Sequence, residues 1–175
     1  MYQYLLVALA IAAAPTVAPI QQSAPAAKPA PSTQKPAAGT AKPAADAKGV
    51  RTVEVVGTED MKFSLATITA KPGEQLRVRL MVKGAMPKIA MAHNFVLLNK
   101  GAKVVDFVTA AMNARATDFI PADKKADVIA STALAGAGET VEVTFKAPAK
   151  PGSYNYLCSF PGHFAMGMRG KLLVK

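Results

Sequence analysis

Apolar and polar residues alternate with a period of two in several short segments between residues 50 and 175. The clearest is segment 76–82, where Leu or Val occupies every second position and Arg77 and Arg79 lie between them. A strand with one buried and one exposed face shows this pattern. Similar alternation or short apolar runs predict further strands at residues 53–55, 61–64, 66–70, 93–98, 128–131, 141–145, 154–158 and 168–174.

Turn-forming residues separate these segments, and one stretch shows helical spacing instead. Sequences containing Gly, two of them with a preceding Pro, mark turns at residues 71–73, 99–101, 136–138 and 150–152. Between residues 104 and 114, Val104, Phe107, Val108 and Ala111 follow the spacing of an amphipathic helix. About eight short strands with one helical insertion predict an all-β fold, a β-sandwich.

The first 20 residues carry a different signal. Residues 5–14 form an apolar run that is too short for a bilayer span of about 20 residues but typical of the core of an export signal. We therefore expect residues 1–20 to be a signal peptide that directs the protein to the periplasm or another extracytoplasmic space. The alternatives are a retained N-terminal membrane anchor or a misassigned start, because no Lys or Arg precedes the apolar run and Pro15 and Pro19 crowd the obvious cleavage positions.

Residues 21–49 are rich in Ala, Pro and Lys, which make up 19 of these 29 positions. They include no Leu, Ile, Val, Met or aromatic residue. Such a segment buries too little apolar area to offset the entropy lost on ordering. We predict a disordered linker at residues 21–49, which would tether the folded domain at residues 50–175 near a membrane if the anchor is retained.

The charge balance narrows the choice of partners. The chain carries 21 Lys and Arg against 11 Asp and Glu, a net charge of +10. Residues 50–175 hold 17 basic and 10 acidic side chains, 17 − 10 = +7. The basic residues are scattered and not interleaved with aromatic residues, so we expect no nucleic-acid partner. A net positive domain favours an acidic protein partner.

The chain holds one Cys and two His, so the candidate chemistry is confined to three residues. A single Cys rules out an internal disulfide and any metal site built from several cysteines. Cys158 and His163 lie five positions apart with Met166 and Met168 close behind, and His93 begins an earlier apolar run. A thiolate, two imidazoles and a weak axial thioether form the ligand set of a blue-copper electron-transfer site.

These residues lie within motifs that span the predicted domain. The motifs are Met61-Lys-Phe63, Met86-Pro-Lys, Met91-Ala-His93-Asn94-Phe95-Val-Leu, Asp127-Val-Ile-Ala, Leu134-Ala-Gly-Ala-Gly-Glu139 and Cys158-Ser-Phe-Pro-Gly-His163. Segment 53–175 resembles the azurin-like cupredoxins, a family of type 1 blue copper proteins that also includes the auracyanins and plastocyanin. The resemblance implies a cupredoxin Greek-key β-sandwich of about eight strands, with residues 100–126 as one helical flap insertion.

The resemblance also implies the ligands of one copper ion that alternates between Cu(I) and Cu(II). His93, Cys158 and His163 would be the equatorial ligands. The axial Met of azurin stands in a Met-x-Gly sequence before the last strand, and residues 168–170 reproduce this register. We therefore expect Met168 rather than Met166 to be the axial ligand, although the loop after His163 is one residue longer than in azurin.

Further roles follow from the same resemblance. The backbone carbonyl of Ala92 would be a distant axial contact, at a position where azurin-like proteins usually have Gly. Asn94 would join the two ligand loops through Ser159, and the backbone N–H groups of Asn94 and Phe160 would donate to the Cys158 sulfur. The expected electron-transfer surface surrounds the edge of His163 and comprises Phe164, Ala165, Met166, Met86 and Met91.

Two further departures from azurin concern the core of the domain. The azurin disulfide is absent because Cys158 is the only Cys, and Phe95 stands where azurin has a core Trp.

The implied function is a one-electron carrier, not an enzyme. A copper enzyme would need additional histidines for a second copper site, and both histidines are already assigned. The expected partners are redox proteins such as c-type cytochromes or copper and haem enzymes, bound by a monomer in weak, transient complexes. The alternative is a copper carrier or stress-buffering protein that uses the same ligand set.

Overall fold

The computed structural model describes residues 49–175. The predicted signal peptide or anchor at residues 1–20 lies outside the described residues, as does the predicted linker at residues 21–49 except for Gly49. Among residues 49–175, no helix combines the length and the apolar character needed to cross a bilayer.

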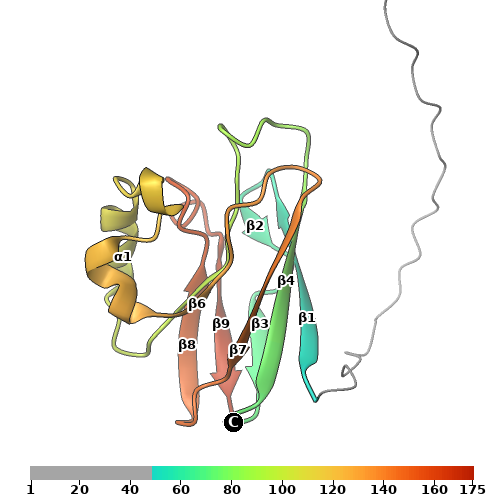
Figure 1. The fold of residues 1–175 in the computed structure, drawn as a ribbon, viewed down its shortest axis with the longest axis vertical. Coiled ribbons are helices and arrows are strands. Elements are labelled where there is room, and N and C mark those ends of the chain that lie inside the picture. The colour runs from blue at the N-terminus through green and yellow to red at the C-terminus, as the bar shows by residue number, and fades with distance from the viewer. Residues whose placement is uncertain (1–48) are drawn as a thin grey trace, which may run out of the picture. The chain divides into compact units, whose positions relative to one another are not determined.

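The first sheet has the strand order β2-β1-β4-β7. Its strands are β1 (Arg51–Thr58), β2 (Lys62–Phe63), β4 (Gln75–Lys83) and β7 (Thr140–Lys146). β1 runs parallel to β4, whereas β2 pairs antiparallel with β1 and β7 pairs antiparallel with β4. The chain turns back directly after β1, so the short strand β2 forms the outer edge of this sheet (Figure 1).

The second sheet has the strand order β3-β9-β8-β5-β6. Its strands are β3 (Thr67–Ala70), β5 (Val96–Leu98), β6 (Val128–Ser131), β8 (Gly152–Leu157) and β9 (Arg169–Val174). β8 lies between β9 and β5 and pairs antiparallel with both. The two strands that flank the Cys158 loop, β8 and β9, are therefore neighbours.

The core lies between the two sheets. The Leu and Val residues of β4 that alternate in the sequence are all buried, whereas Arg77 and Arg79 lie on the other face and pair with Glu142. The second sheet contributes Leu97 and Tyr156 to the same apolar cluster. The predicted all-β sandwich is confirmed, with nine strands among the described residues.

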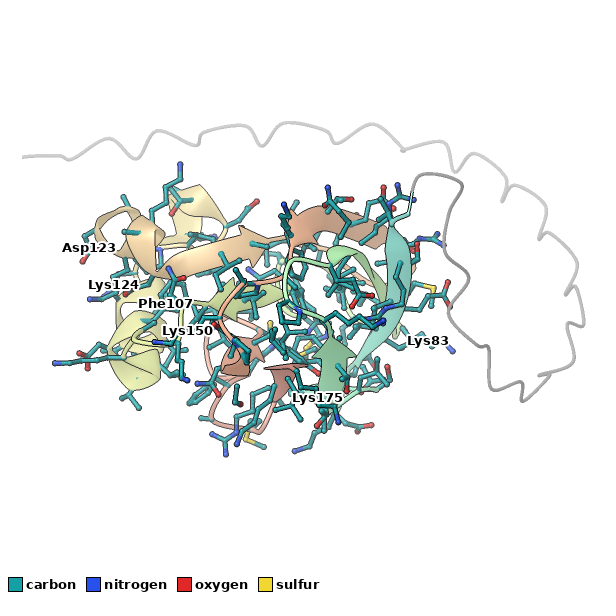
Figure 2. The ribbon with its side chains drawn as sticks, turned by 90° about the horizontal axis from the view of Figure 1, so that it is seen from below. Lys83, Phe107, Asp123, Lys124, Lys150 and Lys175 are labelled. Carbon is teal, nitrogen blue, oxygen red and sulfur yellow. The ribbon has the colours of Figure 1, made fainter. Side chains whose placement is uncertain are left out.

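The helical insertion covers one side of the second sheet. It contains α1 (Val104–Ala111) and two 3-10 helices, η1 (Arg115–Thr117) and η2 (Ala122–Asp127). Phe107, labelled in Figure 2, and Ala111 are fully buried, and Phe107 packs with residues of β5 and the end of β8. The predicted helix at 104–114 ends at Ala111, because the next amides bond three residues back: Asn113 N–H to Ala110 and Ala114 N–H to Ala111.

The predicted strand at 93–98 is shorter in the structure and begins at Val96. His93 instead forms an isolated antiparallel bridge with Ala135, through two backbone hydrogen bonds of 2.9 and 2.8 Å. The loops after β4 and β8 lie at the end of the sandwich opposite the C-terminus (Figure 1). This end carries the predicted ligand residues.

Candidate metal centre

Three potential ligand atoms converge at this end of the sandwich. His93 Nδ1 lies 3.1 Å from His163 Nδ1, and Cys158 Sγ lies 3.5 Å from the same nitrogen. The three ligand atoms all lie within 4.8 Å of one another, and the three side chains are buried. Ligands held about 2.0–2.3 Å from one metal ion are separated by distances of this size. The donor set therefore fits a single thiophilic metal ion.

The segment 158–163 is shaped by its backbone. Cys158 directly follows β8, and its N–H donates to the carbonyl of Met168 at 3.0 Å. Gly162 has φ of +84°, a conformation that a residue with a Cβ rarely adopts. The turn brings the His163 N–H onto the Phe160 carbonyl at 3.1 Å. The imidazole of His163 is thereby folded back toward the sulfur of Cys158.

The two candidate thioethers lie in different environments. Met168 is fully buried and donates its N–H to the His163 carbonyl at 3.0 Å, whereas the side chain of Met166 is 55% exposed. A Cβ placed on Gly57 of β1 would lie 3.1 Å from Met168 Cε and 3.3 Å from two ring atoms of His93. The methyl group of Met168 and the ring of His93 therefore pack against the same point of β1.

Asn94 and Ser159 join the segments that carry His93 and Cys158. The Ser159 N–H donates to Asn94 Oδ1 at 2.9 Å, and Asn94 Nδ2 donates to Ser159 Oγ at 2.9 Å. Asn94 Nδ2 also donates to the carbonyl of Asp118 in the helical insertion at 3.1 Å. Asn94 and Ser159 are both buried, so these bonds are shielded from water.

Burial sets the protonation of the ligand atoms. It raises the pKa of the Cys158 thiol to about 12, although the backbone N–H groups of Asn94 and Phe160 donate to the sulfur and lower the pKa. Burial also lowers the pKa of His93 and of His163 to about 4. The imidazoles are thus neutral and ready to bind a metal at neutral pH, whereas the thiol must lose a proton.

Aromatic rings lie next to His163. The ring of Phe160 lies 4.7 Å from that of His163 and 5.1 Å from that of Phe119. Phe164 is half-buried, and the guanidinium carbon of Arg169 lies 4.9 Å from the centroid of its ring. The other residues of the expected electron-transfer surface are partly or largely exposed, namely Met86, Met91, Ala165 and Met166. Ala92, the expected carbonyl contact, is buried.

Three residues of the β1–β2 hairpin also contact the ligand segments. The sequence predicted no role for any of them, although Lys62 lies within the motif Met61-Lys-Phe63. Gly57 packs under His93 and Met168 as described above. The carboxylate of Glu59 accepts the N–H groups of Ala85 and Met86 at 2.6 and 2.7 Å, which lowers the pKa of that carboxyl. Lys62 Nζ donates to the Met166 carbonyl at 2.7 Å. Lys62 and Met166 are 104 positions apart in the sequence, so no local sequence pattern predicts this contact.

Comparison with known proteins agrees with this geometry. The model of the family "Copper binding proteins, plastocyanin/azurin family" matches residues 50–175. Auracyanin-B of Chloroflexus aurantiacus is 36% identical over 126 residues, which cover 71% of this chain and 52% of auracyanin-B. The chain thus spans about half the length of that relative. Azurin iso-2 of Methylomonas sp. strain J is 41% identical over 123 residues, 67% of this chain and 92% of the azurin.

The solved structures point to the same family. The structure of auracyanin A, described as a "blue" copper protein from Chloroflexus aurantiacus, matches with a TM-score of 0.65 and 36% identity. The match covers 73% of this chain and all of that one. These findings confirm the resemblance inferred from the sequence and the copper cofactor that it implies. The chain belongs to the plastocyanin/azurin family of copper-binding proteins and is a blue copper cupredoxin.

Proposed function

We propose that this protein is a one-electron carrier whose copper is held by His93, Cys158 and His163, with Met168 as the axial ligand. The observation that carries the proposal is the convergence of two neutral imidazoles and one thiol, whose ligand atoms lie within 4.8 Å of one another. The buried Met168 packs beside them against β1. Copper bound here supplies a Cu(II)/Cu(I) couple that accepts or gives one electron. The Ala92 carbonyl is proposed as a distant axial contact.

The chain's contribution is to hold these ligands in one arrangement in both oxidation states. Two backbone bonds fix His93 to Ala135, and the Asn94–Ser159 pair fixes the His93 segment to the Cys158 segment. The N–H groups of Asn94 and Phe160 donate to the sulfur and stabilise its negative charge. Ligands held in this way move little when the charge of the site changes, which favours rapid electron exchange.

The proposed exit for the electron is the edge of His163, surrounded by Phe164, Ala165 and Met166, with Met86 and Met91 on the neighbouring segment. Beside this surface lies a cleft of about 620 Å³ that is lined largely by apolar side chains and bordered by Lys88 and Arg115. Its apolar lining includes Ile89, Met112 and the Phe119–Phe160 ring pair. Apolar contact with a charged border suits short-lived complexes with redox partners.

The charge distribution supports partner attraction over a distance rather than one charged binding patch. Lys83 and Lys124 lie on opposite sides of the domain in Figure 2, and residues 50–175 carry +7 in total. A net positive domain attracts an acidic redox protein, such as a c-type cytochrome with an acidic surface.

The remaining elements of the proposal concern where the carrier works. We propose that residues 1–20 export the protein and that residues 21–49 link the cupredoxin domain to its surroundings, near a membrane if the N-terminus is retained as an anchor. No enzymatic role is proposed, because the sequence has only the two histidines of the copper site and none for a second copper.

One experiment distinguishes electron transfer from copper delivery. The Cu(I)-loaded protein is mixed with an oxidised acidic c-type cytochrome, and separately with a Cu(I)-binding acceptor that has no redox centre. A carrier of electrons reduces the cytochrome by one electron per copper, keeps the copper and slows as salt is added. Rapid loss of Cu(I) to the acceptor, with no reduction of the cytochrome, would assign the protein to copper transfer.

A further inference from the structure

The turn between β1 and β2 contacts both segments that carry copper ligands. Glu59 binds the backbone at Ala85 and Met86 in the segment that leads to His93. Lys62, the first residue of β2, binds the backbone of Met166 in the segment between His163 and Met168. Side chains of this hairpin therefore hydrogen-bond to both of these loops.

The Lys62 contact closes the segment 164–167 from the outside. Inside the segment, backbone bonds join Met166 N–H to Gly162, Gly167 N–H to Phe164 and Met168 N–H to His163. The Met166 carbonyl takes no part in these bonds and accepts from Lys62 Nζ at 2.7 Å. A Cβ on Gly167 would lie 2.6 Å from Lys62 Nζ, so the ammonium group lies directly over this glycine.

Gly167 adds a reason why this segment needs an external contact. Its φ of +98° is accessible to glycine at little cost, and glycine has more freedom to leave its native conformation than any other residue. Gly167 is also the residue directly before Met168. Release of the segment at this point would free the backbone that places the Met168 side chain.

We propose that Lys62 is a positioning residue that latches the His163–Met168 segment and thereby fixes the axial side of the copper site. The inference rests on the proposed role of Met168 as axial ligand. It also implies an electrostatic effect, because the ammonium group carries a positive charge next to the ligand loop. Such a charge disfavours Cu(II) more than Cu(I), so it raises the reduction potential.

Two substitutions separate the hydrogen bond from general effects of surface charge. Lys62→Gln removes the charge and shortens the donor, whereas Lys62→Arg keeps a charged donor. Lys83→Gln is the matched control: Lys83 ends β4 beside Thr58, the last residue of β1, and extends from the edge of the domain (Figure 2). The side chain of Lys83 makes no hydrogen bond or ion pair with residues 49–175.

The first readout is amide hydrogen exchange at Gly167 and Met168, measured in the metal-free and Cu(I)-loaded protein. We expect Lys62→Gln to accelerate exchange at these two amides roughly three- to tenfold, the range for loss of one hydrogen bond. Lys62→Arg and Lys83→Gln should leave both rates near those of the wild type. Unchanged exchange in Lys62→Gln, or equal acceleration in Lys83→Gln, overturns the latch.

The second readout is the reduction potential at low and high salt. Lys62→Gln should lower it more than Lys83→Gln does, Lys62→Arg should restore it, and salt should reduce only the charge-dependent part. Equal shifts in the two Gln variants overturn the electrostatic effect proposed for Lys62, whereas the exchange rates decide its positioning role. The colour of the wild-type Cu(II) protein reports separately on the proposed function: a colourless wild type contradicts that function, whereas a blue wild type with unchanged exchange in Lys62→Gln contradicts the latch alone.

Discussion

Asn94 and Ser159 bond to each other through two contacts of 2.9 Å and in this way connect the residue after His93 to the residue after Cys158. The two residues are 65 positions apart and both are buried. Each is the immediate neighbour of a proposed copper ligand, so the pair couples the positions of an imidazole and a thiolate that come from two distant segments of the chain. Positioning contacts of this kind act on a metal through its ligands.

Replacing Asn94 tests this coupling. Asn94→Ala removes both bonds and the bond to the Asp118 carbonyl, and it leaves the buried Ser159 N–H without this partner, so we expect a loss of about 1–3 kcal/mol in the free energy of unfolding. The visible copper band should shift and broaden as the ligands gain freedom. Thermal or denaturant unfolding and the absorption spectrum measure the two effects. Ser153→Ala, an exposed serine on β8, is the control and should change neither; full stability in Asn94→Ala would contradict the coupling.

Gly57 gives a second test of how the site is packed. A Cβ there would press on Met168 Cε and on the His93 ring, at 3.1 and 3.3 Å. Gly57→Ala should therefore destabilise the protein by about 1–3 kcal/mol through overpacking and should perturb the copper spectrum. Gly101→Ala is a matched control, because a Cβ at Gly101 meets nothing within 4 Å. If the two variants have the same stability and spectrum, β1 does not support the ligands as described.

The choice between the two methionines is tested by their reduction potentials. Met168→Leu should leave the protein blue, because the axial bond is weak and long, and should raise the potential, because an apolar axial neighbour disfavours Cu(II). Met166→Leu alters an exposed side chain and should shift the potential much less. Voltammetry of both variants decides the matter: a larger change in Met166→Leu would make Met166 the ligand.

Copper binding should release about one proton per ion near neutral pH. In the metal-free protein the Cys158 thiol, with a pKa of about 12, is protonated, and the two imidazoles, with pKa values of about 4, are already neutral. Binding thus displaces only the thiol proton, and the apparent Kd for copper should fall about tenfold for each unit rise in pH. Calorimetry in buffers of different ionisation enthalpy counts the protons. Cys158→Ser should release almost none; a wild type that releases none, or two, would refute this protonation scheme.

The β-sandwich could be predicted from the sequence because apolar and polar residues alternate with a period of two along its strands. Leu76 to Val82 alternate in the sequence and are buried alternately in the structure. The local pattern wrongly predicted that His93 begins a strand. His93 belongs to an apolar run, but a tertiary contact, the bridge to Ala135, fixes its backbone in place of a regular strand. The helix ends three residues before the predicted end, where its bonding changes from four residues back to three.

The candidate site, too, could be predicted only in part from the sequence. The converging residues His93, Cys158 and His163 could be named from residue types and spacing, and the resemblance to azurin added Asn94 and Ser159. The roles of Glu59 and Lys62 could not be found in this way, because charged residues of an exposed hairpin are ordinary surface residues until the fold brings them to a distant loop. Their contacts depend on the pairing of β1 with its neighbours, which a single sequence does not display.

The visible absorption spectrum during titration with Cu(II) tests the central claim most directly. The account predicts an intense thiolate-to-copper band in the wild type that saturates at one equivalent and is abolished in Cys158→Ser. A copper-loaded wild type without colour, or a Cys158→Ser variant that keeps the band, would contradict a blue copper site built from His93, Cys158 and His163.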